Sequence, residues 1–358
     1  MNTVKINMRD FVDFCALLSA DRDLYLPLNV NGDVVFDKWI SPEESSINFG
    51  AVNTVKSPKD LFFPHSENIA GFKMQGKNIS VIVTKKEMKP FVLFGVRQCD
   101  VKSFEVLDRV FLADPVDEYY AQRRENATVI SLACARPDTS CFCKVFDIDA
   151  SEPALGGTDA AAWIEGENMY LKPLTEKGEY VVSLAGSLAS ALTADDENEL
   201  DGHKKKIKSI TLRLPYSNLS LDKFGGDALN AIFDSPKWAS LSETCLSCGT
   251  CTFICPTCQC YDIRDYDTGH GISRYRCWDS CMCSDFTRMA HGNPRTSTLE
   301  RFRQRYMHKL VYFPANNGGE FSCVGCGRCI TKCPISMNIV KVIKEFSKPS
   351  ENEEAKNG

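Results

Sequence analysis

Three short apolar runs in the first half of the chain have the length of buried strands. They are ISVIVT at 79–84, FVLFGV at 91–96 and TVISLAC at 128–134. Between the last two lie DVKSFEVLDRVFL at 100–112, whose apolar residues recur at helical spacing, and the polar stretch EYYAQRREN at 118–126. This order of strands and helices predicts a β–α–β unit.

Two cysteines stand at the carboxyl ends of strands in this unit. Cys99 follows the strand at 91–96, and Cys134 ends the strand at 128–134. Asp100 is the expected N-cap of the helix that comes next. If the two strands are parallel, both cysteines lie at the edge where open α/β sheets place their sites. We therefore expect Cys99 and Cys134 to be neighbours in space.

The region from 150 to 240 shows ordinary patterning and no recognisable chemistry. YVVSL at 180–184 resembles a short strand, and the charged stretch DDENELDGHKKK at 195–206 predicts a solvated helix or loop. At the end of the chain, residues 348–358 are polar and lack large apolar side chains, which predicts a disordered tail.

The cysteine content changes this picture, because the chain has 18 cysteines in 358 residues. Asp10 and Asp13 stand where a secretion signal would need an apolar core, so the cysteines are expected to be reduced and available to metal. The apolar runs are much shorter than the roughly eighteen residues that cross a membrane. A formal net charge of −5 gives no electrostatic reason to bind nucleic acid. We expect a cytoplasmic protein that binds neither membrane nor nucleic acid.

Eight cysteines form two copies of one motif, C-x2-C-x2-C-x3-C followed by proline. The first copy is Cys245, Cys248, Cys251 and Cys255 before Pro256, and the second is Cys323, Cys326, Cys329 and Cys333 before Pro334. Three thiolates at this spacing can bind three corners of a 4Fe–4S cubane, and nearby glycines let the backbone pass close to it. Structural zinc also uses C-x2-C pairs, but it normally joins two pairs across a longer loop.

In two-cluster proteins with this motif, the fourth cysteine of each copy binds the other cluster. We therefore assign one 4Fe–4S cluster to Cys245, Cys248, Cys251 and Cys333. The other is assigned to Cys255, Cys323, Cys326 and Cys329. The stretch TLERFRQRYMHKLVYF at 298–313 predicts a helix between the two copies, which favours a helical ferredoxin domain. We expect most of its basic residues to face solvent and one or two to face a cluster or a partner.

Four more cysteines form a third set in the N-terminal half: Cys99, Cys134, Cys141 and Cys143. Because C-x-C is a less specific spacing, a third 4Fe–4S cluster is the hypothesis here and zinc is its main competitor. Five cysteines are left near the ferredoxin motifs: Cys258, Cys260, Cys277, Cys281 and Cys283. A fourth metal site is a further hypothesis for them, and thiols that tune the neighbouring clusters are the simpler explanation. Cys15, in an apolar stretch, is expected in the core.

These patterns predict an α+β protein of two domains and a tail. Residues 1–230 are expected to form an α/β domain that carries one iron–sulfur site, and residues 231–347 a mainly helical, ferredoxin-like domain with two 4Fe–4S clusters. No G-x-G-x-x-G follows a strand, and no P-loop or G-x-S-x-G is present, so we expect no flavin or NAD site in this chain. Electron transfer is the simplest role for clusters without a recognisable substrate site.

Six stretches together resemble one family of iron–sulfur proteins. They are FGVRQCDVKSFEVLDRVF, RRENATVISLACARPDTSCFC, CLSCGTCTFICPTCQCYDI, RCWDSCM, NPR and CVGCGRCITKCP. In this order, and over most of the chain from SPKDLFFP onward, they are similar to the iron–sulfur subunit of anaerobic sulfite reductase and to the sulfhydrogenase β subunit. The resemblance implies that the third set of cysteines holds a cluster. Cys258, Cys260 and Cys281 also match cysteines of the family, whereas Cys277 and Cys283 depart from its pattern.

The resemblance also implies a relay between two partners and no catalytic residues in this chain. One partner would be a flavin- and NAD(P)-binding reductase subunit, and the other a catalytic subunit of hydrogenase, sulfite reductase or disulfide reductase type, with hydrogenase preferred. Two alternatives belong to other classes of protein. One is an enzyme that uses Cys258, Cys260 and Cys281 as a catalytic metal site, and the other is a zinc-stabilised assembly protein without a redox role.

Overall fold

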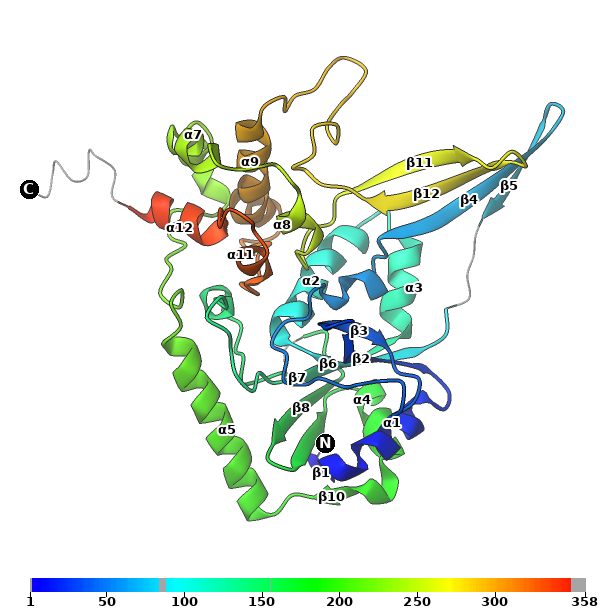
Figure 1. Cartoon of the computed structure of the whole chain (residues 1–358), viewed down its shortest axis with the longest axis vertical. Helices are drawn as coiled ribbons and strands as arrows, with labels where there is room; N and C mark the ends of the chain where they lie inside the picture. Colours follow the sequence, from blue (N-terminus) through cyan, green and yellow to red (C-terminus); the bar gives the residue numbers. More distant parts are fainter. Residues whose placement is uncertain (1, 84–87, 155, 349–358) are drawn as a thin grey trace, which may run out of the picture.

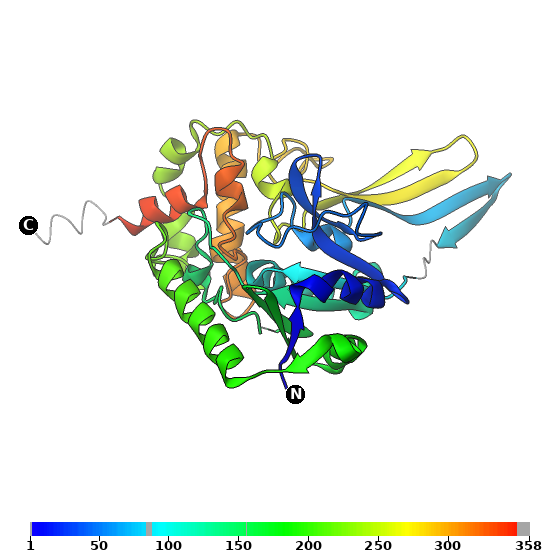
Figure 2. The same cartoon turned by 60° about the horizontal axis from the view of Figure 1, so that its bottom comes forward.

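The structure is a computed structural model that describes residues 2–83, 88–154 and 156–348. Within these residues the chain is an α+β protein built on two sheets, one of eight strands and one of four. The four-stranded sheet forms an arm that extends away from the rest of the molecule in both views (Figures 1 and 2). Apart from Lys348, the predicted tail lies outside the described residues.

The eight-stranded sheet has parallel strands at its centre. Its order is β10 (Ala189–Ala191), β1 (Val4–Asn7), β9 (Asn168–Pro173), β8 (Ala160–Glu165), β7 (Ala127–Leu132), β6 (Phe91–Val96), β2 (Asp23–Val30) and β3 (Asp33–Lys38). β2, β6, β7 and β8 pair in parallel, and the outer pairs are antiparallel. β6 and β7 are buried along their whole length, as expected for parallel strands that are covered on both faces.

Helices cover both faces of this sheet. α1 (Phe11–Ser19) and α4 (Glu176–Leu184) pack on one face, and α2 (Gln98–Phe111), α3 (Glu118–Asn126) and α5 (Ala194–Leu212) pack on the other. The buried position of Cys15 in α1 and the helix at DDENELDGHKKK in α5 are confirmed. The strand expected at YVVSL is wrong: this stretch ends α4, where Val181 packs into the core and the Thr175 side chain caps the helix.

The predicted β–α–β unit is confirmed. β6 pairs in parallel with β7, from Phe91 opposite Ala127 to Val96 opposite Ser131. The expected N-cap is wrong, because α2 begins at Gln98 and its N-cap residue is Arg97. Asp100 therefore lies inside the first turn of the helix, where it is buried.

The four-stranded arm is antiparallel and joins distant parts of the chain. Its order is β11 (Tyr261–Asp267), β12 (Ile272–Trp278), β4 (Ser66–Gln75) and β5 (Asn78–Val83). The region after residue 231 is therefore not helical throughout. The burial expected for ISVIVT is also wrong: every residue of β5 is exposed, because β5 is an edge strand of the projecting arm. Thr84, the last residue of that run, lies outside the described residues.

The remaining helices gather around the two ferredoxin motifs. They are α6 (Leu229–Ile232), α7 (Lys237–Ser242), α8 (Thr250–Phe253), α9 (Thr298–Met307), α10 (Phe313–Asn316), α11 (Arg328–Thr331) and α12 (Ile339–Ser347). α7, α9 and α12 pack around a common core that includes Trp238 and Phe302. A π-helical turn at His308–Tyr312 links α9 to α10, which confirms the helix predicted between the motifs. Among the described helices, none has both the length and the apolar character to cross a membrane.

Candidate metal centre

The two ferredoxin motifs have the same local backbone. Ser247 (φ 54°) and Gly249 (φ 74°) are left-handed in the first copy, and Gly325 (φ 60°) and Gly327 (φ 78°) are left-handed at the equivalent positions of the second. Each copy continues into a four-residue helix, α8 or α11. Backbone turns of this kind form concave loops lined by N–H groups, which bind anions including iron–sulfur clusters. Both copies therefore have the backbone shape that a cubane requires.

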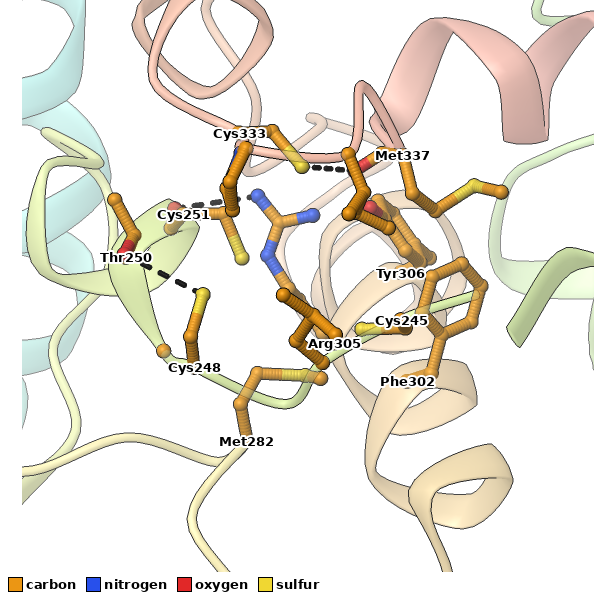
Figure 3. Close-up of a pocket in the computed structure, with 14 residues that line it drawn as sticks. Cys245, Cys248, Thr250, Cys251, Met282, Phe302, Arg305, Tyr306, Cys333 and Met337 are labelled. Atoms are coloured by element: carbon orange, nitrogen blue, oxygen red, sulfur yellow. Dashed lines mark hydrogen bonds between the residues drawn. The ribbon is translucent and has the colours of Figure 1, made fainter. Parts of the chain in front are cut away.

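Cysteines from both copies line one pocket (Figure 3). Cys245, Cys248 and Cys251 come from the first copy, and Cys333 comes from the second. The structure thus brings together the four residues that the spacing assigned to one cluster, including the exchanged fourth cysteine. Their role as ligands of one cluster stays a prediction.

A buried cation without a carboxylate partner occupies the same pocket. Arg305 is 2% exposed and lies among the cysteine side chains in Figure 3. Its Nη2 atom donates to the carbonyl oxygen of Cys251 at 3.3 Å, while Nε and Nη1 have no hydrogen-bond partner among the described residues. A buried, under-satisfied guanidinium is costly unless negative charge is supplied nearby. The donor set and this cation together fit an anionic cluster.

The expectation that most basic residues of 298–313 face solvent is wrong. Arg301, Arg305 and Lys309 are all buried, and only Arg303 and His308 are half-buried. Burial lowers the pKa of Lys309, but the sulfur atoms of Cys255, Cys258 and Cys323, once ionised, outweigh that effect and shift the pKa upward. The helix therefore directs positive charge toward the cysteines.

Cys255 lies with the cysteines of the second copy. It is close enough to Cys323, Cys326 and Cys329 to interact electrostatically with each of them. Burial raises the pKa of Cys323 to about 12, so without metal this thiol is protonated at neutral pH. Metal binding at this set would release protons and turn buried thiols into ligands.

The third set also lines one pocket. Cys99, Cys134, Cys141 and Cys143 surround it, and Cys326 of the second copy joins them. The expected proximity of Cys99 and Cys134 is confirmed, because parallel pairing of β6 and β7 puts both at one edge of the sheet. Burial raises the pKa of Cys141 to about 12 and also raises that of Cys134. These buried thiols fit a metal cluster, and the kind of cluster stays a prediction.

The second set, Cys255 with Cys323, Cys326 and Cys329, adjoins the third set. The Phe142 amide donates to the carbonyl oxygen of Gly325 at 2.9 Å. A Cβ atom added to Gly325 would lie 2.5 Å from the backbone nitrogen of Cys143, so only glycine fits this contact. Asn53 Nδ2 also donates to the carbonyl oxygen of Cys326 at 2.6 Å. The second motif is thus packed directly against the loop that carries the third set.

The five leftover cysteines divide into two groups. Cys258, Cys260 and Cys281 lie close together, and a hydrogen bond from Cys281 lowers the pKa of Cys260 to about 7. The interactions that shift the pKa of Cys277 and of Cys283 involve no cysteine in the part of the chain that is described. In that same part, no three His, Cys, Asp or Glu side chains meet in the arrangement that holds a single metal ion. The fourth metal site stays a prediction.

Sequence reasoning missed residues from the segment before β4. Lys59, in a 3-10 turn at Pro58–Leu61, is 2% exposed, and its Nζ donates to the carbonyl oxygens of Cys255 and Cys258. Burial lowers the pKa of Lys59, and the thiolates of Cys258 and Cys255 oppose that shift. The only sequence signal was one lysine two residues ahead of the apolar run LFFP.

Comparison with known proteins supports iron–sulfur clusters in this chain. A family model described as a 4Fe-4S dicluster domain matches residues 244–337, which contain both ferredoxin motifs. The sulfhydrogenase 2 subunit beta of Pyrococcus furiosus is 33% identical over 349 residues, which make up 96% of this chain and 98% of that protein. The match therefore covers the N-terminal cysteines as well as the dicluster region. The chain belongs to the iron–sulfur electron-transfer subunit family of the sulfhydrogenase β subunit.

Proposed function

We propose that this chain is a cytoplasmic, multi-cluster relay within an oxidoreductase complex. It passes electrons between two partner subunits, one a flavin- and NAD(P)-binding reductase and the other a catalytic protein of hydrogenase type. The observation that supports this most is the placement of three sets of four cysteines next to one another. Cys326, a member of the second set, also lines the pocket of the third set. The name of the Pyrococcus relative supports the hydrogenase-type partner.

In this proposal the chain has two parts. Residues 1–230 carry the 4Fe–4S cluster of Cys99, Cys134, Cys141 and Cys143, and residues 231–347 carry the two ferredoxin-type clusters. When bound, the clusters supply one-electron carriers. The protein contributes thiolate ligands, backbone N–H groups and buried cations such as Arg305, and these set the potentials.

The partners are tested by isolating the tagged chain without oxygen from its own cells and identifying co-purifying proteins by mass spectrometry. A nickel–iron hydrogenase subunit together with a flavoprotein is the expected result. A sirohaem protein in place of the hydrogenase would make the chain the iron–sulfur subunit of an anaerobic sulfite reductase. Absence of both a flavoprotein and a redox enzyme would contradict the relay.

The ligand assignment is tested by Cys326→Ser. Because Cys326 is assigned to the second cluster, the variant is expected to lose about four iron atoms per chain and partner-dependent turnover. Cys15→Ser is the matched control, since Cys15 is buried in α1 away from the motifs. Unchanged iron and turnover in Cys326→Ser would refute the assignment, and colourless, zinc-containing wild-type protein would favour the assembly protein.

A second candidate function rests on the grouping of Cys258, Cys260 and Cys281. In the described structure these thiols do not meet in a metal-binding arrangement, so they would have to draw closer to hold a catalytic metal with an open coordination position, which would make the chain an enzyme. The three proposed cubanes account for about twelve irons per chain, at roughly four irons each. The site would be supported if the wild type holds metal in excess of these, and if Cys281→Ser loses that excess while Cys277→Ser and Cys283→Ser keep it. Equal metal content in all three variants and the wild type would rule it out.

A further inference from the structure

Two buried lysines converge on the short segment from Cys255 to Cys258. Lys59 is 2% exposed, and its Nζ donates to the carbonyl oxygens of Cys258 at 2.9 Å and Cys255 at 3.1 Å. The same ammonium group lies 3.8 Å from the centre of the Trp278 ring. Lys309 is 3% exposed and donates to Thr257 Oγ1 at 2.7 Å and to the carbonyl oxygen of Ser322 at 3.1 Å. Lys59 belongs to the N-terminal half of the chain and Lys309 to the C-terminal half.

Neither ammonium group is neutralised by a hydrogen-bonded carboxylate. Among the described residues, every hydrogen-bond acceptor of Lys59 and Lys309 is a neutral carbonyl or hydroxyl oxygen. A buried charge without a hydrogen-bonded counter-charge is expensive, so negative charge on the neighbouring thiolates and a bound cluster would stabilise both lysines. At Lys59 the carboxylate of Asp60 adds a smaller attraction. An oxidised cubane with four thiolates carries a charge of about −2, and its reduced form carries one more negative charge.

One hydroxyl group connects Lys309 to a cluster ligand. Thr257 Oγ1 lies 3.3 Å from Cys255 Sγ and 2.7 Å from Lys309 Nζ. The Thr257 hydroxyl donates to the Ser322 carbonyl at 2.7 Å, an acceptor that it shares with Lys309. Because Lys309 also donates to that oxygen, the hydroxyl proton can rotate toward a Cys255 thiolate when the cluster is bound. The Thr257 hydroxyl thus lies between the Lys309 ammonium and the Cys255 sulfur, so the lysine can influence this ligand electrostatically at short range.

The other two sites have less uncompensated positive charge. At the third site, Arg328 is neutralised by a bidentate contact with Asp100, which leaves Arg97 as the buried cation there. At the first site, Arg305 is the buried cation, and it is shared with Cys329 of the second set. The second site alone has two lysines in addition to its share of Arg305, within the part of the chain that the structure describes.

We propose that Lys59 and Lys309 give the cluster of Cys255, Cys323, Cys326 and Cys329 the highest reduction potential of the three. Positive charge favours the more negative, reduced state. This middle cluster therefore collects electrons that arrive from a neighbouring cluster, each originating from a reduced flavin of the partner. Each step adds one electron to the cluster, and no bond in the protein forms or breaks. The inference rests on the proposed ligand assignment.

The test is an EPR-monitored redox titration of the intact chain, purified without oxygen and reduced with dithionite. Lys59→Met and Lys309→Met are each expected to lower the reduction potential of the same single cluster. At a fixed solution potential, the ratio of reduced to oxidised cluster should fall about tenfold, which corresponds to about 59 mV for a one-electron couple. Lys59→Arg keeps the charge and is expected to keep most of the potential. Lys56→Met is the matched control, because the Lys56 side chain is 60% exposed and lies only three residues from Lys59.

The outcomes separate this inference from the proposed function. Wild-type protein without iron–sulfur clusters would refute the proposed function itself. Three intact clusters whose potentials are unchanged in both methionine variants, or shift equally at all three sites, would overturn the inference alone. If the methionine variants lose iron, Thr257→Val decides: a lower potential of one cluster supports the inference, and an unchanged potential overturns it.

Discussion

Arg328 and Asp100 form a buried bidentate ion pair between residues 228 positions apart in the chain. Nη1 of Arg328 lies 2.6 Å from Oδ1 of Asp100, and Nη2 lies 2.8 Å from Oδ2. The two residues directly adjoin Cys329 and Cys99, which are assigned to different clusters. A rigid pair at this place therefore fixes the position of the second site relative to the third.

Asp100→Asn is expected to destabilise the protein strongly. The substitution leaves the Arg328 guanidinium buried without a counter-charge, and breaking such a buried pair typically costs about 3–5 kcal/mol. Chemical unfolding under anaerobic conditions measures the change in the free energy of unfolding. Glu320→Gln is the control, because Arg109 and Glu320 pair at 2.7 Å with side chains 40% and 37% exposed, and such pairs contribute at most about 1 kcal/mol. Equal losses in both variants would contradict the special role of the buried pair.

Gly325→Ala is expected to disturb two clusters at once. The added methyl group would lie 2.5 Å from the backbone of Phe142 and Cys143, and the left-handed φ of +60° is unfavourable for alanine. Because this contact joins the second and third sites, both should lose iron. Gly318→Ala has the same backbone cost, about 1 kcal/mol, but no atom within 4 Å of the new Cβ. Iron content and melting temperature of the two variants give the comparison, and matching values would refute the close-contact argument.

The sequence predicted those parts of the site that depend on local spacing. The β6–β7 pairing and the proximity of Cys99 to Cys134 followed from apolar runs with a helix between them, a pattern that stays within about forty residues. The likeness to the sulfhydrogenase β subunit also held over 96% of the chain. Strand identity failed at YVVSL, because packing of Val181 against the sheet overrode its β-branched composition.

Contacts between residues far apart in the sequence could not be predicted from motif spacing or apolar periodicity. Nothing near Lys59 in the sequence indicates the carbonyl oxygens of Cys255 and Cys258, which lie about two hundred residues away. Asp100 was predicted to cap the helix because it stands ahead of a stretch with helical spacing. Its actual partner, Arg328, lies far away in the second ferredoxin motif, so local spacing could not indicate it. β5 looked buried because composition alone does not say that a strand lies at the edge of a projecting arm.

Cys134→Ser is expected to remove the third cluster and leave the other two. Cys134 belongs to the N-terminal pocket, and its position is fixed by an amide hydrogen bond to the Ala150 carbonyl at 2.8 Å. The expected loss is about four iron atoms per chain, with the EPR signals of the two ferredoxin-type clusters retained. Iron analysis together with zinc analysis checks this, because a fall in zinc rather than iron would assign the pocket to zinc. Full metal retention would show that Cys134 is not a ligand.

His308 is expected to make folding sensitive to mild acid. Burial, with Lys309 and Arg295 nearby, lowers its pKa from 6.5 to about 4, so the folded protein holds this imidazole neutral while the unfolded chain protonates it below pH 6.5. Stability is therefore lost as pH falls from 6.5 toward 4, by about 1.4 kcal/mol at pH 5.5. His308→Gln should reduce the fall in unfolding free energy between about pH 7.5 and pH 5.5 by that amount, and His270→Gln, at an exposed position, should not. Equal acid sensitivity of the His308→Gln variant and the unaltered protein would show that the proton is taken up elsewhere.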